Sequence, residues 1–216
     1  MTEKGKKILE KIRNSVVNFD VEGIRSASLE AIGTGMNTGR VIEAMGEGMG
    51  VVGKKYEAGE YFVPELIMAG ETMKEGLAVL KPHMEDEPQA TLGTAVVATV
   101  LGDLHDIGKN IFITLLVAAG FNVVDLGVDV PAGKIADAVR SSGAIIVGLS
   151  ALLTTNLDQI PLIINELEKV GLREKVKVIV GGATVTEAFT KEIGADGYAK
   201  EAVTGVDICK KWAKQS

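Results

Sequence analysis

The residues best suited to chemistry lie in the segment GDLHDIGKN, residues 102–110. The chain has only two histidines, and one of them, His105, stands here between Asp103 and Asp106. A carboxylate two residues before a histidine can hydrogen-bond one ring nitrogen, which fixes the tautomer and makes the other nitrogen a better metal ligand. The pattern therefore predicts either a histidine ligand with its supporting carboxylate or, about as well, an ordinary loop whose polar side chains cap the next helix.

Other kinds of site fit this segment poorly. Gly102 and Gly108 do not complete a G-x-G-x-x-G dinucleotide pattern, and Lys109 is followed by Asn110 where a phosphate-binding P-loop has serine or threonine. No G-x-S-x-G elbow supplies a nucleophilic serine. Cys209 is the only cysteine, which excludes an internal disulfide and a thiolate zinc site. A metal that brings its own equatorial ligands needs only one protein atom, and His105 could supply it.

The apolar pattern changes near residue 84, which predicts two domains. Before that point apolar residues recur at helical spacing, as in Ile8, Ile12 and Val16, and predict a four-helix bundle. The expected helices are 3–18, 21–33, 37–58 and 62–81, with N-caps at Asp20 and Asn37 and breaks at 33–35 and Gly59. The segment KPHMEDEPQATLG, with its prolines and acidic residues, predicts a linker. We therefore place a bundle domain at 1–84, a linker at 85–91 and a second domain at 92–216.

The second domain has the pattern of a parallel sheet covered by helices on both faces, an α/β fold of the flavodoxin or Rossmann-like type. The expected strands are 94–101, 122–126, 144–149, 176–180 and 197–199, and the expected helices are 108–119, 132–141, 156–170, 185–193 and 201–213. In such sheets ligands bind beyond the carboxyl ends of the strands, at the topological switch point. Residues 102–110 follow the first strand, so the fold also predicts a site there.

The composition disfavours two classes of partner. A net charge of −6 disfavours binding to a nucleic-acid backbone or an anionic membrane. The N-terminus lacks the apolar core of a secretory signal, and no uncharged apolar run approaches the roughly 18 residues of a membrane span. We expect a cytoplasmic protein that binds neither nucleic acid nor membrane.

Two further segments at expected strand ends, GLSALLTTN and VIVGGAT, extend the pattern of the first. Together with DLHDIG they resemble the cobalamin-binding signature D-x-H-x-x-G, S-x-L, G-G, in the same order. The matching residues are Asp103, His105, Gly108, Ser150, Leu152, Gly181 and Gly182. In the bundle, MGVVGKKYEAGEYFVPEL resembles the helical cap module of cobalamin-dependent methionine synthase and of small corrinoid proteins. The two-module layout is most similar to methyl-carrying corrinoid proteins of methylamine, methanol or methoxyaromatic metabolism.

The resemblance implies that the chain binds cobalamin or a related corrinoid, with His105 as the axial ligand of cobalt and Asp103 behind it. The detached nucleotide tail would lie near Ser150 and Thr154, where two glycines allow close approach, although a tight strand-to-helix turn explains those glycines equally well. The expected cofactor contacts are Asp103, His105, Asp106, Gly108, Ser150, Leu152, Thr154, Gly181, Gly182, Tyr56, Phe62, Val63 and Leu66. Lys109 and Asn110 either contact the corrin side chains or begin a helix, and His83 is expected to be solvated.

The last four contacts lie in the bundle, which would cover the upper face of the corrin and shield a reactive methyl group. Apolar residues at helical spacing are also typical of a bundle core, so both readings stay open for them. The cap would have to move aside for each partner, with a hinge near residues 82–91.

One residue departs from the family pattern. In methionine synthases a serine extends the His–Asp pair, and Asn156 stands at that position here. An amide can donate to Asp103 but cannot pass a proton onward as a hydroxyl can. We therefore predict that Asn156 supports Asp103 without completing a proton relay.

The function that the resemblance implies is a methyl carrier that is not a complete enzyme by itself. Its partners would be a substrate:corrinoid methyltransferase, a corrinoid:acceptor methyltransferase acting on a thiol such as coenzyme M or on tetrahydrofolate, and a reductive activase. The main alternative is a cobalamin-responsive sensor, which would normally carry an output domain such as a basic helix-turn-helix. A mutase cobalamin subunit, against which the helical cap argues, and an unrelated flavodoxin-like binder are the remaining alternatives.

Overall fold

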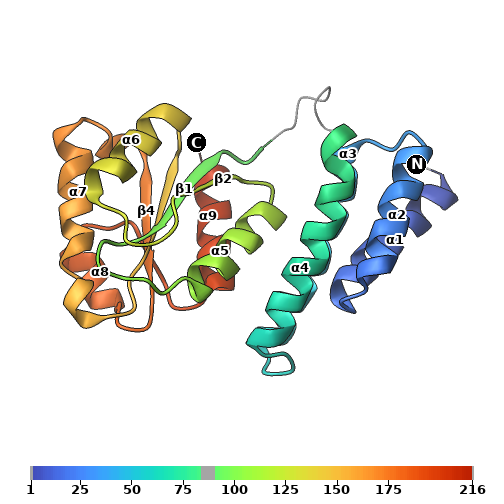
Figure 1. Ribbon diagram of the computed structural model, residues 1–216, viewed down its shortest axis with the longest axis horizontal. Coiled ribbons are helices and arrows are strands. Elements are labelled where there is room, and N and C mark those ends of the chain that lie inside the picture. Colours follow the sequence, from blue (N-terminus) through green and yellow to red (C-terminus); the bar gives the residue numbers. More distant parts are fainter. Residues whose placement is uncertain (1, 84–90, 216) are drawn as a thin grey trace. The chain divides into compact units, whose positions relative to one another are not determined.

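The computed structural model describes residues 2–83 and 91–215 of the chain. They form two compact units, one made of the N-terminal helices and one made of a sheet with its own helices (Figure 1). Residues 85–90 of the predicted linker, and most of the predicted hinge, lie outside the described residues. No helix in the described ranges is both long and apolar enough to cross a membrane.

The first unit is a bundle of four helices, as predicted from its apolar spacing. The helices are α1 (Glu3–Val17), α2 (Val21–Gly33), α3 (Thr38–Glu57) and α4 (Val63–Leu80), followed by the short turn η1 (Lys81–His83). The predicted stripe of Ile8, Ile12 and Val16 is buried in the bundle core. Asp20 caps α2 by accepting a hydrogen bond from the Gly23 N–H at 2.9 Å. Asn37 precedes α3 as predicted, but its side chain makes no capping bond.

The second unit is a five-stranded parallel sheet with helices between the strands, and the fold class predicted from the sequence is confirmed. Its elements are β1 (Thr94–Thr99), α5 (Ile107–Ala118), β2 (Asn122–Asp125), α6 (Ala132–Ser142), β3 (Ile146–Ser150), η2 (Thr154–Asn156), α7 (Gln159–Lys169), η3 (Arg173–Lys175), β4 (Lys177–Gly181), α8 (Glu187–Glu192), β5 (Gly197–Ala199) and α9 (Ala202–Ala213). The strand order is β2-β1-β3-β4-β5, which is the flavodoxin-like doubly wound order.

The sheet is buried on both faces because successive side chains of a strand point to opposite sides. Alternate residues such as Val96, Ala98 and Val147 join a core with the apolar sides of α6 and α7. The helices α5 and α9 cover the other face (Figure 1). This two-sided burial accounts for the nearly continuous apolar runs that identified the strands.

Two elements near the motifs differ from the predicted ranges. β1 ends at Thr99 and not at residue 101, because Gly102 turns the chain with a φ of +80° and Val100 pairs only in an isolated bridge with Val130. The helix predicted from residue 156 begins at Gln159, after the 3-10 turn η2. Both changes lengthen the loops at the carboxyl edge of the sheet.

Candidate functional site

The three motif segments meet at one edge of the sheet. In the parallel register Thr99 of β1 lies opposite Ser150 of β3, and Ser150 lies opposite Gly181 of β4. The chain leaves β1 toward β2 on one side and returns through β3 on the other, so the switch point lies between β1 and β3. The loops after these two strands carry the D-x-H and S-x-L segments, which is where doubly wound sheets bind ligands.

Asp103 joins the two loops and orients His105. Its Oδ1 lies 2.7 Å from the Nδ1 atom of the His105 ring and accepts the His105 backbone N–H at 3.0 Å. Its Oδ2 accepts the Leu152 N–H at 2.6 Å. Thr99 fixes the same turn, because its hydroxyl donates to the His105 carbonyl at 2.9 Å. One carboxylate therefore holds the histidine ring, the histidine backbone and the S-x-L loop together.

The environment of Asp103 decides which histidine nitrogen is available. Burial of this fully enclosed side chain raises its pKa, but hydrogen bonds from the His105 and Leu152 N–H groups and from the His105 ring outweigh burial and leave the pKa below its ordinary value. An ionised carboxylate can only accept, so Nδ1 of His105 must carry the proton that it donates. The lone pair is then on Nε2, the atom suited to bind a metal.

The lowered pKa predicts a pH-dependent stability difference for Asp103→Asn. A carboxyl whose pKa is depressed on folding stabilises the protein above its unfolded pKa of about 3.9, and this stabilisation disappears as pH falls through the folded pKa. We expect the variant to be less stable by about 1–3 kcal/mol near neutral pH, because paired N–H donors lose their charged acceptor. Urea unfolding of both proteins without cofactor should show this gap closing in acid; a gap that is constant from neutral pH into acid would contradict the assignment.

The His105 ring is accessible, and the loops around it carry exposed apolar side chains. Its side chain is 53% exposed, in contrast to the buried Asp103. Leu101, Leu104 and Ile107 from the same segment and Leu153 from the loop after β3 are large hydrophobic residues that lie exposed. Exposed apolar residues that gather around a potential metal ligand are typical of a surface covered by a ligand. The set fits a flat, largely apolar group with a metal at its centre.

Other residues of the first motif start helix α5. Asp106 precedes the helix, and its carboxylate accepts from Asn110 Nδ2 at 3.0 Å. Lys109 is buried, with only 2% of its side chain exposed, and its Nζ lies 2.8 Å from Asp125 Oδ1 and from Asn110 Oδ1. Of the two roles considered for Lys109, the structure supports the helix start. A charged residue in the first turn of a largely apolar helix was the sequence signal for this ion pair, in which only the lysine is buried.

Contacts within the protein explain why glycine is required at two of the expected cofactor contacts, Gly181 and Gly182. Gly182 has a φ of +126°, and a Cβ on it would overlap the backbone of Ala151. A Cβ on Gly181 would lie 2.9 Å from the Ala199 carbonyl oxygen. The contact favours the tight-turn explanation for Gly182, whereas Gly181 is restricted by the neighbouring strand β5, with which it pairs at Ala199. Gly108 differs, because a Cβ there would have nothing within 4 Å.

The remaining residues of the S-x-L segment lie beside the site with different exposures. Ser150 is half-buried at the end of β3, and Thr154 is exposed at the start of η2. Leu152 is half-buried, and its contribution to the site is its backbone N–H, which Asp103 accepts.

Asn156 does not hydrogen-bond directly to Asp103, as the sequence had suggested. Its side chain is buried, and Nδ2 donates to the Leu101 carbonyl at 3.0 Å while Oδ1 accepts from the Thr155 hydroxyl at 2.7 Å. The prediction of an Asn156 to Asp103 hydrogen bond is therefore wrong. The physical reason is that backbone N–H groups already occupy Asp103, whereas the Leu101 carbonyl faces the amide.

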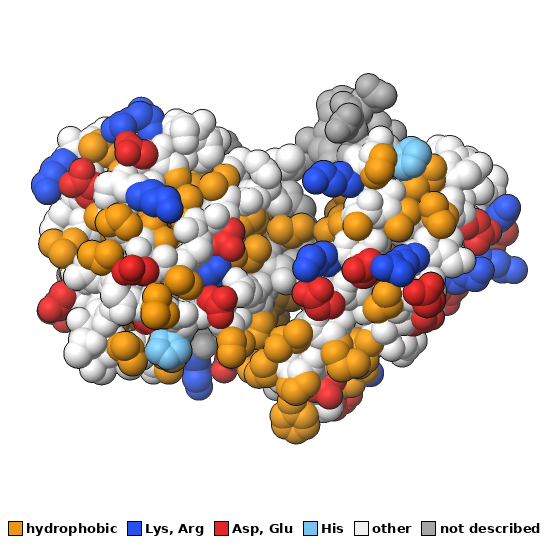
Figure 2. Space-filling model, viewed as in Figure 1, with side chains coloured by type: hydrophobic (Ala, Val, Ile, Leu, Met, Phe, Trp, Pro, Cys, Tyr) orange, Lys and Arg blue, Asp and Glu red, His pale blue; other side chains and the backbone are white. Residues whose placement is uncertain are grey.

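The expected cap residues lie in the bundle, around the turn from α3 to α4. Tyr56 is half-buried, Phe62 and Val63 are exposed, and Leu66 is only 5% exposed because it packs in the bundle core. Figure 2 shows hydrophobic side chains gathered on the surface where α4 begins. Two exposed residues there were missed by the sequence reading, namely Ile67 and Met68. Their apolar side chains were the only signal in the sequence, and their exposure is known only from the structure.

The turn that presents Phe62 is held firmly. The neighbouring Tyr61 ring packs against Phe19 with centroids 5.6 Å apart, and Lys55 lies over the Tyr61 ring at 4.6 Å. Glu65 accepts the Phe62 N–H at 2.8 Å, which fixes the first turn of α4. An exposed phenylalanine on an ordered turn is well suited to contact another group.

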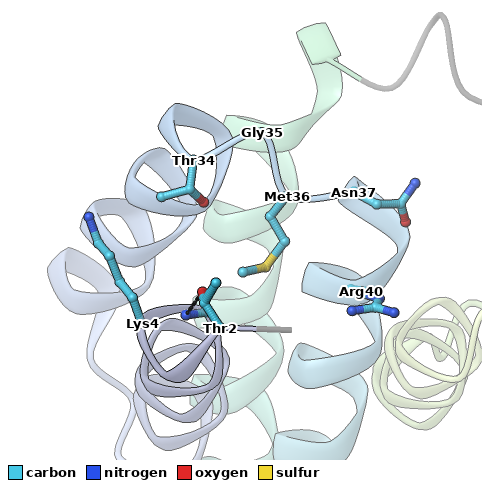
Figure 3. Close-up of a pocket in the computed structure, with 8 residues that line it drawn as sticks. Thr2, Lys4, Thr34, Gly35, Met36, Asn37 and Arg40 are labelled. Atoms are coloured by element: carbon cyan, nitrogen blue, oxygen red, sulfur yellow. Dashed lines mark hydrogen bonds between the residues drawn. The ribbon is translucent and has the colours of Figure 1, made fainter.

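A separate pocket of about 400 Å³ lies in the bundle (Figure 3). Its lining includes Thr2 and Lys4 at the start of α1 and Thr34, Met36 and Arg40 around the α2–α3 turn. Thr2 is engaged in capping α1, since it accepts the Gly5 N–H at 3.2 Å. None of the predicted site residues lines this pocket.

Comparisons with known proteins agree with the geometry. A family model described as "B12 binding domain" matches residues 93–207, and a second with the same description matches residues 8–81. A trimethylamine corrinoid protein of Methanosarcina acetivorans is 38% identical over 206 residues, which cover 94% of this chain and 95% of that protein.

Two solved structures are similar over nearly the whole chain. A cobalamin-binding protein from Desulfitobacterium hafniense has a TM-score of 0.78 at 38% identity, covering 94% of this chain and 98% of its own. A chain of the methanol:cobalamin methyltransferase complex from Methanosarcina barkeri has a TM-score of 0.86 at 32% identity, covering 97% and 81%. The chain belongs to the B12-binding family and, within it, to the methyltransferase-associated corrinoid proteins.

Proposed function

We propose that this chain binds a corrinoid through His105 and carries a methyl group on its cobalt from a substrate-specific methyltransferase to a second methyltransferase. The observation that carries the proposal is the His105 ring, exposed among apolar side chains and locked by the buried Asp103 at the β1/β3 switch point. The relatives named for trimethylamine and the structure named for methanol support small methylated compounds as the source of the methyl group.

His105 would hold the cobalt through Nε2. Asp103 keeps the proton on Nδ1, so the ligating nitrogen needs no rearrangement before it binds. Hydrogen bonding of Nδ1 to a carboxylate also raises the electron density of the ring, which strengthens its bond to a metal. The corrinoid, when bound, supplies the cobalt that accepts and releases the methyl group, and the protein supplies ligation and shielding.

The apolar residues beside His105 would form the platform under the macrocycle. Covering Leu104 and Ile107 removes apolar surface from water, worth about 25 cal/mol per Å² of area covered. This gain is available only to a ligand broad enough to reach both residues and the histidine together. A flat macrocycle meets that requirement, whereas a single metal ion does not.

In the bundle, Phe62 and Val63 would shield the upper face, together with Ile67 and Met68. Leu66 would not contribute to this shielding, because its side chain lies in the bundle core. Aliphatic and aromatic side chains exclude water without offering a nucleophile, which suits the protection of a reactive methyl group. Tyr56, half-buried on α3, stays a predicted contact.

The proposed partners follow from carriage between two enzymes. One methyltransferase would load the methyl group from an amine or alcohol, and another would pass it to a thiol or folate acceptor. A reductive activase would restore the cobalt after accidental oxidation. We place this cycle in the cytoplasm, and none of its covalent steps requires a nucleophile from this chain.

Reconstitution with hydroxocobalamin tests the proposal. The protein should retain one corrinoid per chain through gel filtration, and after reduction with titanium(III) it should take up a methyl group from methyl iodide, seen in its absorption spectrum. The loaded protein should then lose the methyl group to coenzyme M or tetrahydrofolate when a matching methyltransferase is added. Failure of the wild-type chain to retain the corrinoid would overturn the proposal.

Gly108→Ala separates a binding role for this glycine from a folding role. The second residue of α5 has open space around its Cβ position, so alanine should stabilise the protein without cofactor by up to about 1 kcal/mol through helix propensity. If the corrin lies against this turn, the added methyl group should weaken hydroxocobalamin binding by about tenfold, as misfit of a buried group commonly does. Thermal unfolding and equilibrium dialysis measure the two effects.

Gly133→Ala is the matched control for this substitution. Gly133 is the second residue of α6 and, like Gly108, has nothing within 4 Å of a Cβ. The control should show the same gain in stability with unchanged affinity. Equal affinities for both variants would remove Gly108 from the binding surface.

A further inference from the structure

The turn that carries the proposed ligand is held from two sides by other loops of the sheet edge. Residues 101–103 form this turn, in which the Asp103 N–H donates to the Val100 carbonyl at 3.1 Å and Gly102 has a φ of +80°. Asp129 reaches it from the loop between β2 and α6, and Asn156 reaches it from η2.

Asp129 contacts the turn through both its side chain and its backbone. Its Oδ1 accepts the Gly102 N–H at 2.7 Å, and its own N–H donates to the Asp103 carbonyl at 3.0 Å. Its φ is +55°, a left-handed conformation that is unfavourable for a residue with a side chain. Such a backbone persists where surrounding contacts impose it, and these two hydrogen bonds are the contacts here.

Asn156 holds the same turn from the other side. Its buried Nδ2 donates to the Leu101 carbonyl at 3.0 Å, and a carbonyl can only accept, which fixes the orientation of the amide. The amide lies so close to Gly102 that a Cβ on that residue would be 2.7 Å from Nδ2. The turn therefore fits between the two side chains only with glycine at its centre.

We propose that Asp129 and Asn156 form a clamp on residues 101–103, and that this clamp places the Asp103 carboxylate so that it holds His105 and Leu152 at once. Both are positioning residues: their hydrogen bonds to the turn go to residues 101, 102 and 103. The proposal deepens the proposed function, and its consequence for corrinoid binding rests on that function.

The Asp103 carboxylate must contact partners on two different loops at the same time. Oδ1 of Asp103 must reach the His105 ring while Oδ2 reaches the Leu152 N–H, and these partners belong to loops that follow different strands. A small rotation of the turn cannot preserve both contacts. Loss of the clamp should therefore weaken the hydrogen bond between Asp103 and the Leu152 N–H, although Asp129 itself bonds only to residues 102 and 103 of the turn.

The test compares Asp129→Gly with Asp129→Asn by amide hydrogen exchange in the protein without cofactor. Glycine permits the positive φ but lacks the carboxylate, whereas asparagine retains an acceptor oxygen and tolerates the same backbone. We expect the Leu152 amide to exchange about tenfold faster in the glycine variant and within about twofold of wild type in the asparagine variant. Hydroxocobalamin affinity should fall about tenfold in the glycine variant alone.

A second variant, Asn156→Ala, should accelerate exchange of the same Leu152 amide from the other side of the clamp. Thermal unfolding of each variant gives the folded fraction, so that global destabilisation is separated from a local change. Acceleration confined to the Gly102 amide in Asp129→Gly, with Leu152 exchange and affinity unchanged, would overturn the proposal. Absence of hydroxocobalamin binding by wild type would overturn the proposed function instead, and the exchange data would still decide the clamp.

Discussion

Gly182→Ala should destabilise the protein by about 3 kcal/mol or more, which is among the largest effects expected of a single methyl group. The φ of +126° at this residue lies in a region that side chains rarely adopt, and the new Cβ would overlap the carbonyl of Ala151. Because the Ala151 N–H donates to the Gly181 carbonyl at 3.0 Å, the two strand ends cannot separate without losing that hydrogen bond. Urea unfolding of the protein without cofactor measures the loss.

Gly171→Ala is the control that isolates backbone strain. Gly171 has a φ of +70°, but a Cβ there meets nothing within 4 Å. Its substitution should cost only about 1 kcal/mol, the usual penalty for a left-handed residue that gains a side chain. Equal losses for the two variants would show that the Ala151 contact relaxes freely, contrary to the packing described.

His105→Ala should weaken hydroxocobalamin binding by about 100-fold while leaving the fold intact. Removing a partner that supports a ligand commonly costs about 10–100-fold in metal affinity, so removing the ligand itself should reach at least the upper end. The half-exposed ring contributes little to the core, and Asp103 keeps the N–H groups of His105 and Leu152. The free energy of unfolding, measured by thermal unfolding, should therefore fall by no more than about 1–3 kcal/mol, the range for one hydrogen bond to a charged group.

Two further measurements make this result specific. His83→Ala removes the other histidine, which lies exposed in η1, and should leave affinity unchanged. Free imidazole added to His105→Ala should restore part of the binding, because it can occupy the vacated position. Unchanged affinity in His105→Ala, or an equal loss in His83→Ala, would contradict axial ligation by His105.

The sequence was most informative where burial of one or both faces of an element fixes the spacing of its apolar residues. The continuous apolar strands predicted the parallel sheet, and the spacing of Ile8, Ile12 and Val16 predicted the bundle, because both patterns follow directly from which faces are covered. The polar residues at the end of β1 were found for the same reason. Asp103 and His105 stand out because of their spacing and because they follow directly on an apolar strand.

The arrangement of the loops could not be predicted in the same way. Asn156 bonds to Leu101, and Asp129 to Gly102, through contacts between segments far apart in sequence and without a period. Leu66 and Met68 are both apolar on α4, and only packing shows that the first is buried and the second exposed. Helical spacing alone does not identify which neighbours cover a given residue.

The central claim is that this chain binds a corrinoid through the Nε2 atom of His105. Electron paramagnetic resonance of the cobalt(II) form, reconstituted in protein grown with ¹⁵N-labelled histidine, tests it most directly. Coupling to one axial nitrogen splits each cobalt line into a triplet with natural nitrogen, and we predict a doublet in the labelled protein and in labelled His83→Ala. A triplet that persists in the labelled protein would show that the axial nitrogen comes from the cofactor's own base, and the claim would fail.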